Sequence, residues 1–165
     1  MKILMVCLGN ICRSPLAEGI LKQKASEAGL NWTVDSAGTN GYHVGEAPHL
    51  LSQKVARLNG IDISGQKARR FRASDFQHYD LIYAMASDVM DEIKHIARHE
   101  FDPTRADLLL NVLEPSCNKD VPDPWYGTEP GYHSVYSLIE SACEEIIRTA
   151  LKKKTINPQI SNPNP

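Results

Sequence analysis

The sequence of 165 residues is short of features that would tie it to a membrane or to nucleic acid. It has no apolar run long enough to span a bilayer, and its first residues lack the basic, apolar and small-residue order of a signal peptide. Its 18 Lys and Arg nearly balance 20 Asp and Glu, which gives a formal net charge of −2. We therefore expect a cytoplasmic protein with no nucleic-acid or membrane partner, in which any anion binding is local.

Cysteine is also scarce, with four residues in the chain. Cys7, Cys12, Cys117 and Cys143 show no metal-ligand spacing, and a reducing compartment argues against a disulfide framework. This leaves thiol chemistry or simple burial, and we expect no metal site. The length suits one domain, predicted over residues 1–154, followed by a mobile tail over residues 155–165, which is rich in Pro and Asn.

The most informative stretch of the sequence is CLGNICRSP, residues 7–15. The apolar residues 3–6 before it predict a buried strand, and the glycine-containing turn ends that strand. Ser14 is predicted to be an N-cap and Pro15 the first residue of a helix. Residues 7–14 are therefore expected to form a loop, called here the 7–14 loop, between the end of a strand and the start of a helix.

Such a loop suits a phosphate group, because the unpaired N–H groups and the dipole of a helix N-terminus attract anions. Cys7 is predicted to lie at the floor as a nucleophile, and Arg13 at the rim, where a guanidinium grips two phosphoryl oxygens. The positive surroundings favour a thiolate. A buried, inert Cys7 is the alternative, but it explains neither Arg13 nor the Gly9-Asn10 turn. The predicted phosphate-binding residues are Leu8, Gly9, Asn10, Ile11, Cys12, Arg13 and Ser14.

The remaining apolar runs predict three further strands, at residues 32–34, 81–85 and 108–112, separated by helical patterns. Strands that alternate with helices imply an α/β fold, a doubly wound four-stranded parallel sheet with helices on both faces. In such folds ligands bind beyond the carboxyl ends of the strands, where the 7–14 loop is expected.

A long aperiodic stretch, residues 114–131, contains the segment DPWYG, and loops of this length in small domains are usually functional. Asp123 is the candidate general acid, although Asp-Pro is also a common turn dipeptide. Trp125 and Tyr126 beside it would form aromatic walls for a phenyl ring. Tyr42, in the glycine-rich residues 40–45, is the third aromatic candidate for the pocket, and Leu8 completes the predicted set.

The segments CLGNICRSPLAE, SAG, KAR and DPWYG together resemble the low-molecular-weight protein tyrosine phosphatases over nearly the whole chain. The resemblance implies a metal-independent, cofactor-free phosphoric monoester hydrolase that acts on phosphotyrosine in proteins and binds inorganic phosphate, sulfate or vanadate. It implies Cys7 as the nucleophile that forms a phosphocysteine, Arg13 as the transition-state clamp, and Asp123 as acid and then base. Cys12 is implied as a redox partner of Cys7.

Three alternatives remain open at this point. Protein arginine phosphatases have a small threonine where this chain has Ile11, which favours phosphotyrosine here. Arsenate reductases need further cysteines, which residues 81–90 lack. A phosphate-binding module without catalysis would not require Cys7, Arg13 and Asp123 together.

Two positions depart from the family pattern: Gln66 replaces a frequent histidine, and Ala86 replaces a frequent aspartate.

Overall fold

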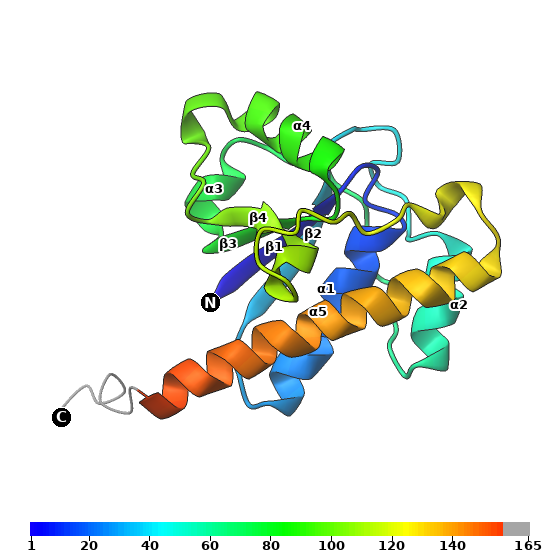
Figure 1. Cartoon of the computed structure of the whole chain (residues 1–165). Coiled ribbons are helices and arrows are strands. Elements are labelled where there is room, and N and C mark those ends of the chain that lie inside the picture. The colour runs from blue at the N-terminus through cyan, green and yellow to red at the C-terminus, as the bar shows by residue number, and fades with distance from the viewer. Residues whose placement is uncertain (157–165) are drawn as a thin grey trace.

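Four parallel strands form the central sheet, which confirms the predicted doubly wound α/β fold. In the computed structural model, which describes residues 1–156, the strand order is β2-β1-β3-β4, so β1 lies between two neighbours (Figure 1). Five of the six residues of β1 are buried, in keeping with its apolar sequence. The strands are β1 Lys2–Cys7, β2 Thr33–Gly38, β3 Leu81–Ala84 and β4 Ala106–Leu108.

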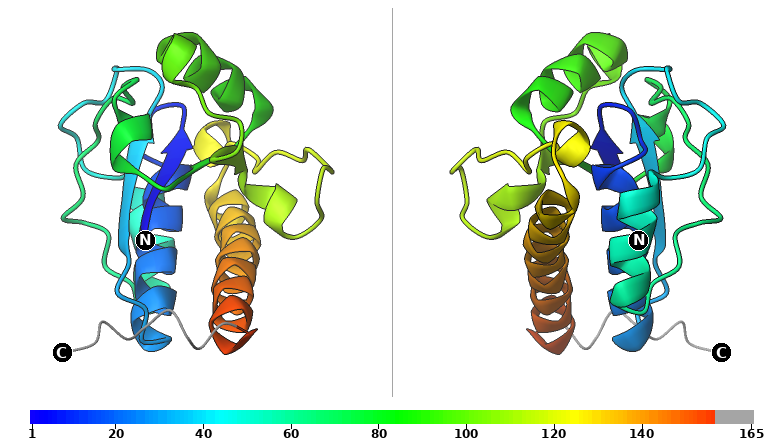
Figure 2. Two further views of the ribbon diagram at one scale, coloured as in Figure 1. Left: turned by 90° about the vertical axis from the view of Figure 1, so that its left-hand side faces the viewer. Right: turned by 90° about the vertical axis from the view of Figure 1, so that its right-hand side faces the viewer.

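Helices cover both faces of the sheet, as the two views turned by 90° from Figure 1 show (Figure 2). Helix α1 and the long helix α5 lie together on one side, and α4 lies on the other. The helices are α1 Arg13–Glu27, α2 Leu50–Leu58, α3 Asp75–His78, α4 Ser87–Ala97 and α5 Glu129–Ile156, with short 3-10 turns η1 Arg98–Glu100, η2 Leu109–Val112 and η3 Pro124–Tyr126.

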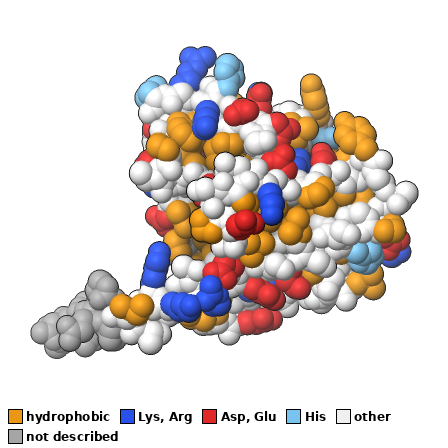
Figure 3. Space-filling view, in the orientation of Figure 1, with side chains coloured by type: hydrophobic (Ala, Val, Ile, Leu, Met, Phe, Trp, Pro, Cys, Tyr) orange, Lys and Arg blue, Asp and Glu red, His pale blue; other side chains and the backbone are white. Residues whose placement is uncertain are grey.

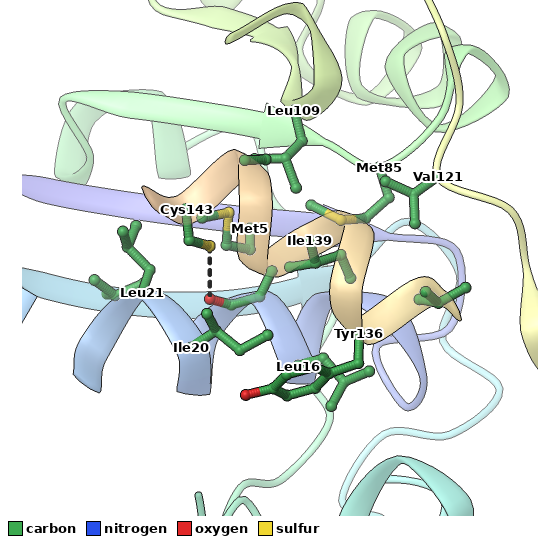
Figure 4. Packing of buried hydrophobic residues seen from close by; sticks show 14 of the residues in the cluster. Met5, Leu16, Ile20, Leu21, Met85, Leu109, Val121, Tyr136, Ile139 and Cys143 are labelled. Carbon is green, nitrogen blue, oxygen red and sulfur yellow. Dashed lines mark hydrogen bonds between the residues drawn. The ribbon is translucent and has the colours of Figure 1, made fainter. Parts of the chain in front are cut away.

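The alternation of side chains along β1 divides the core in two. Ile3, Met5 and Cys7 belong to the cluster shared with α1 and α5, whereas Leu4 and Val6 belong to the cluster shared with α4. Figure 4 shows part of the first cluster, where side chains from α1 and α5 meet those of the sheet. Because both faces of β1 pack against apolar side chains, the position of the strand in the core is fixed, and the position of its carboxyl end is fixed with it.

The fourth strand differs from its prediction. The sheet pairing ends at Leu108, and the apolar residues that follow form the turn η2 instead. Asn111 bends the chain back, because its Nδ2 donates to Asp107 Oδ1 at 2.7 Å and to Asn118 Oδ1 at 3.1 Å. An apolar run indicates burial, and here side-chain hydrogen bonding decided against an extended chain. The second strand also extends further than predicted, to Gly38.

Helix α4 is capped from outside its own segment. Ser87 is the first residue of the helix, after Ala86, whose side chain makes no capping hydrogen bond. The carboxylate of Asp120 accepts from the Ser87 N–H at 2.8 Å. A distant loop residue therefore caps the helix, and local sequence could not indicate it.

Helix α5 continues through Thr155 and Ile156, so it includes two residues of the predicted tail; the other nine, residues 157–165, lie outside the described residues. Lys and Arg side chains gather near its C-terminal end, beside hydrophobic ones (Figure 3). Cys143, on the inner face of α5, is fully buried as expected for a packing thiol, and burial raises its pKa. Within residues 1–156, no helix is both long and apolar enough to cross a membrane.

Candidate active site

A pocket of about 290 Å³ opens at the carboxyl end of β1, where the sequence places the 7–14 loop. Its walls come from three segments that are far apart in the chain: the 7–14 loop, the loop after β2, and the segment around η3. The lining residues are Cys7, Leu8, Gly9, Ile11, Cys12, Arg13, Asn40, Tyr42, His43, Asp123, Trp125 and Tyr126. Nearly all the predicted site residues therefore meet in one place.

Cys7 lies at the floor of this pocket with 2% of its surface exposed. Its Sγ is 3.0 Å from Ser14 Oγ and accepts from the Asn10 N–H at 3.3 Å. Asn10 has a positive φ of 58°, a conformation that Asn tolerates better than most residues and that curls the loop around the sulfur. The prediction of Ser14 as the N-cap is wrong, because Cys12 has that position. The Ser14 hydroxyl contacts the Cys7 thiol instead.

A buried chain of hydrogen bonds supports the loop from behind. Asn10 Nδ2 donates to Ser14 Oγ at 2.8 Å and to Ser36 Oγ at 2.9 Å, while its Oδ1 accepts from the Arg69 N–H at 3.0 Å. Ser36 in turn donates to Glu18 Oε1 at 3.1 Å. Because Ser14 Oγ accepts from Asn10, its own proton can point to Cys7 Sγ at 3.0 Å; the Ala37 carbonyl, its other acceptor, is more distant at 3.5 Å. The contributions of Ser36 and Glu18, which come from β2 and α1, were not predicted from the sequence.

Glu18 is unusual in this network because it is a buried carboxyl group, 6% exposed. Burial is the largest cause that raises its pKa, while the hydrogen bonds from Lys22 and Ser36 act in the opposite direction. Lys22 Nζ lies 3.0 Å from Glu18 Oε2 and is itself half exposed. The hydrogen-bonded chain therefore ends at a buried carboxyl group, and the hydrogen bonds from Lys22 and Ser36 partly offset the effect of burial on its pKa.

The two departures from the family pattern have different surroundings. Gln66 donates from Nε2 to the Pro15 carbonyl at 3.1 Å, and its buried Oε1 has no partner among the described residues. It therefore contacts the start of α1 and not the hydrogen-bonded chain through Asn10. Ala86 is 4% exposed and belongs to the apolar cluster under α4, where a carboxylate would need a partner.

Arg13, the first residue of α1, has 5% of its side chain exposed and is fixed by two acceptors. Its Nη1 donates to the Val121 carbonyl at 3.0 Å, and its Nη2 lies 3.5 Å from Asp123 Oδ2. The other oxygen of Asp123 accepts from the Trp125 N–H at 3.0 Å, at the start of η3. The predicted clamp and the predicted acid are thus in direct contact across 110 positions of sequence.

The mouth of the pocket carries the four residues predicted for substrate contact. Leu8 and Trp125 are partly exposed, whereas Tyr42 and Tyr126 are almost fully exposed. Exposed aromatic side chains at the mouth, above a polar floor, suit a planar substrate ring. The sequence did not indicate Asn40 and His43, which also line the pocket; their position beside Tyr42 in the loop after β2 was the available signal.

Cys12 points away from the solvent beneath the loop. Its Sγ lies 3.8 Å from the Tyr132 hydroxyl, and burial is the main cause that raises the pKa of this thiol to about 12. Cys12 is therefore a protonated thiol at neutral pH, although it also borders the pocket. Among residues 1–156, His, Cys, Asp and Glu side chains form no group of three or more that would hold a metal ion.

Fold and pocket together define an α/β protein with a cysteine at the floor of a loop that joins a strand to a helix, and comparison with known proteins gives its family. Residues 2–157 match the family described as "Low molecular weight phosphotyrosine protein phosphatase". A putative low molecular weight protein-tyrosine-phosphatase of Synechocystis is 38% identical over 164 residues, which cover 95% of this chain and 100% of the relative. The chain belongs to the low molecular weight protein tyrosine phosphatase family, which confirms the resemblance seen in the sequence.

Two solved structures extend the comparison. The protein tyrosine phosphatase of Entamoeba histolytica, crystallised with Hepes in its active site, is 34% identical, with a TM-score of 0.84 and coverage of 93% of this chain and 99% of that chain. The Drosophila arginine phosphatase DARP is 31% identical, with a TM-score of 0.82 and coverage of 91% and 98%. The same scaffold is thus found in enzymes named for two different phosphoryl substrates.

Proposed function

We propose that this protein hydrolyses phosphotyrosine in protein substrates through a phosphocysteine at Cys7. The observation that carries the proposal is the meeting of Cys7, Arg13 and Asp123 in one pocket, with aromatic side chains at its mouth. A nucleophile, an anion clamp and a proton donor are the groups that cleavage of an aryl phosphate requires.

The reaction has two halves. In the first, the Cys7 thiolate attacks phosphorus, the bond to the aryl oxygen breaks, and protonated Asp123 gives its proton to the leaving phenolate. In the second, the Asp123 carboxylate takes a proton from water, which attacks phosphorus, and the S–P bond breaks to release phosphate and the thiolate. Asp123 Oδ2 lies on the Arg13 side of the pocket, where both proton transfers would occur.

Arg13 and the N–H groups at the start of α1 stabilise the transferred phosphoryl group. Arg13 is held by the Val121 carbonyl, so the guanidinium is oriented before substrate binds. Ser14 Oγ, 3.0 Å from Cys7 Sγ, is placed to donate its proton to the thiolate both before attack and as the sulfur departs. No step in this scheme calls on a metal or cofactor, and inorganic phosphate, sulfate or vanadate would compete for the same donors.

Phosphoarginine is the second candidate substrate, because DARP shares the fold at 31% identity. The side chain of Ile11 lines the pocket at 7% exposure, and it is bulkier than the threonine expected at this position in an arginine phosphatase. Tyr42 and Trp125 at the mouth suit an aromatic ring better than a flexible guanidinium chain. Both observations favour phosphotyrosine.

Parallel turnover of phosphotyrosine and phosphoarginine peptides tests this choice. We expect phosphotyrosine to be the preferred substrate by kcat/KM, and Ile11→Thr to shift the ratio toward phosphoarginine. Preference of the parent protein for phosphoarginine would reject phosphotyrosine as its substrate. Binding of vanadate with turnover of neither peptide nor p-nitrophenyl phosphate would instead indicate a phosphate-binding module.

Three further parts of the proposal rest on the sequence. Cys12 is proposed to form a reversible disulfide with Cys7, supported by its place beneath the same loop. The protein is proposed to act in the cytoplasm without nucleic-acid or membrane partners, in keeping with its near-neutral charge. Residues 1–154 are proposed to act as a single domain.

A further inference from the structure

We propose that the ring of His49 is a positioning element for catalysis: together with His43 it holds Trp125, and through Trp125 it sets the place of Asp123 above the 7–14 loop. The inference rests on the proposed role of Asp123 as the acid. Neither histidine was indicated by the sequence, and their contacts appear only in the tertiary structure.

His49 is joined directly to the 7–14 loop. Its backbone N–H donates to the Ile11 carbonyl at 2.8 Å, so the residue moves with the loop that holds Cys7. Its ring is oriented by a second contact, in which Nδ1 accepts from the Leu51 N–H at 3.1 Å and caps helix α2. The imidazole therefore has a fixed direction relative to the nucleophile.

The ring of His49 touches two aromatic residues. It stacks on Tyr132 with ring centroids 5.2 Å apart and planes 23° apart, and Tyr132 is 1% exposed in the core. Its edge meets the indole of Trp125 at 5.5 Å and 77°. Both geometries are favourable for aromatic pairs. His49 therefore connects the exposed indole to a rigid part of the molecule.

His43 contacts the same indole from the loop after β2. The ring centroids of His43 and Trp125 are 5.5 Å apart, and His43 Nδ1 lies 2.7 Å from Glu46 Oε2. The imidazole also packs on the 7–14 loop, because a Cβ placed on Gly9 would lie 3.1 Å from His43 Cδ2. Trp125 thus contacts two imidazoles: the ring of His49, whose backbone is hydrogen-bonded to the 7–14 loop, and the ring of His43, which packs against Gly9 of that loop.

Trp125 transmits this position to the acid. Its backbone N–H donates to Asp123 Oδ1 at 3.0 Å within the three-residue turn η3, so the two residues move together. The indole is 43% exposed, and its contacts with the histidine rings restrain the position of η3 beyond what the short turn does by itself. Loss of the His49 ring would let η3 shift, and a misplacement of about 1 Å is enough to cost on the order of 10²-fold in rate.

The sharpest test replaces His49 with Asn, since Asn keeps an N-cap acceptor for α2 but removes the ring. We expect His49→Asn to lower kcat on a phosphotyrosine peptide by about 10-fold or more, a part of the roughly 10²- to 10⁴-fold effect of a general acid. Turnover of p-nitrophenyl phosphate, whose leaving group needs little protonation, should change less than about 3-fold. In an Asp123→Ala background the same substitution should cause no additional loss.

His99→Asn is the matched control, because the His99 side chain is 88% exposed and should leave both substrates unaffected. His43→Ala provides a second variant that does not touch the α2 cap, and it should show the same dependence on the leaving group. Equal losses on both substrates, or a loss that persists without Asp123, would overturn the inference while leaving Asp123 as the acid. Absence of any dependence on the leaving group in Asp123→Ala itself would overturn both the acid assignment and this inference.

Discussion

Gly38 lies against Gly9, and this contact fixes how the 7–14 loop folds over the end of the sheet. Cys7 and Gly38 are register partners at the ends of β1 and β2. A Cβ on Gly38 would lie 2.9 Å from the carbonyl carbon of Gly9, 2.9 Å from the Leu8 oxygen and 3.0 Å from the Asn10 nitrogen. The second strand must therefore end in a residue without a side chain.

Gly38→Ala is expected to displace the loop, since all three contacting atoms belong to backbone. Overpacking of this kind costs about 1–3 kcal/mol, and a shift of about 1 Å at the nucleophile costs on the order of 10²-fold in kcat. Urea unfolding and turnover measure the two effects. Gly131→Ala, in helix α5 with no atom within 4 Å of its added Cβ, is the control and should be neutral or slightly stabilising. Unchanged activity in Gly38→Ala would mean that the loop adapts.

Substitutions at two of the proposed catalytic residues should have different signatures. Cys7→Ser should abolish turnover while retaining substrate binding, because the thiolate begins every reaction. Asp123→Ala should slow phosphotyrosine hydrolysis by about 10²- to 10⁴-fold and p-nitrophenyl phosphate less, since a tyrosine phenolate with a pKa near 10 needs a proton. Steady-state kinetics on both substrates measures this. Small, equal losses on both would make Asp123 a turn residue and place the acid elsewhere in residues 114–131.

Competition by inorganic anions tests the phosphate site. Phosphate, sulfate and vanadate should each inhibit competitively at the 7–14 loop. Arg13→Lys should raise their inhibition constants about 10- to 100-fold, because one bidentate charge-assisted contact is lost. Arg148→Lys, on the exposed face of α5, is the matched control and should change nothing. Non-competitive inhibition, or equal inhibition of Arg13→Lys and the parent, would place the anion at another site.

Mild peroxide should convert Cys7 to a sulfenic acid, which condenses with the Cys12 thiol to a disulfide and water. Burial keeps Cys12 protonated, with its pKa raised to about 12, so peroxide should react first at Cys7. Activity should return with thiol reductant, and Cys12→Ser should be inactivated irreversibly, whereas Cys117→Ser should behave as the parent. Mass spectrometry that finds only a sulfinic acid at Cys7 in the parent would contradict the disulfide.

Glu18 predicts a pH dependence of stability. Burial raises its pKa in the folded state above the unfolded value of 4.5, so its contribution to stability is present below that value and is lost as pH rises through the folded pKa. As pH rises above about 4.5, Glu18→Gln should therefore gain free energy of unfolding relative to the parent. Urea unfolding at several pH values measures the difference. A difference that stays constant with pH would show that Lys22 and Ser36 offset the burial completely.

The sequence determined much of this protein because its strongest signals are local. The apolar residues of β1, the glycine-containing turn and Pro15 mark a strand, a loop and a helix by short-range chemistry, and this pattern predicted where Cys7 and Arg13 lie. The alternation of strands and helices predicted the parallel sheet for the same reason. The DPWYG segment was predicted to be functional because it interrupts that alternation.

Tertiary structure alone decided the features that depend on residues far apart in the chain. The contact of Arg13 with Asp123, the hydrogen bonds from Asn10 through Ser36 to Glu18, and the cap of α4 by Asp120 join separate elements. The turn η2 replaced a predicted strand because side-chain hydrogen bonds prevailed over apolar character. Hydrophobic periodicity reports which face of an element is buried, whereas the direction of a polar side chain depends on which partner the fold brings within about 3 Å of it.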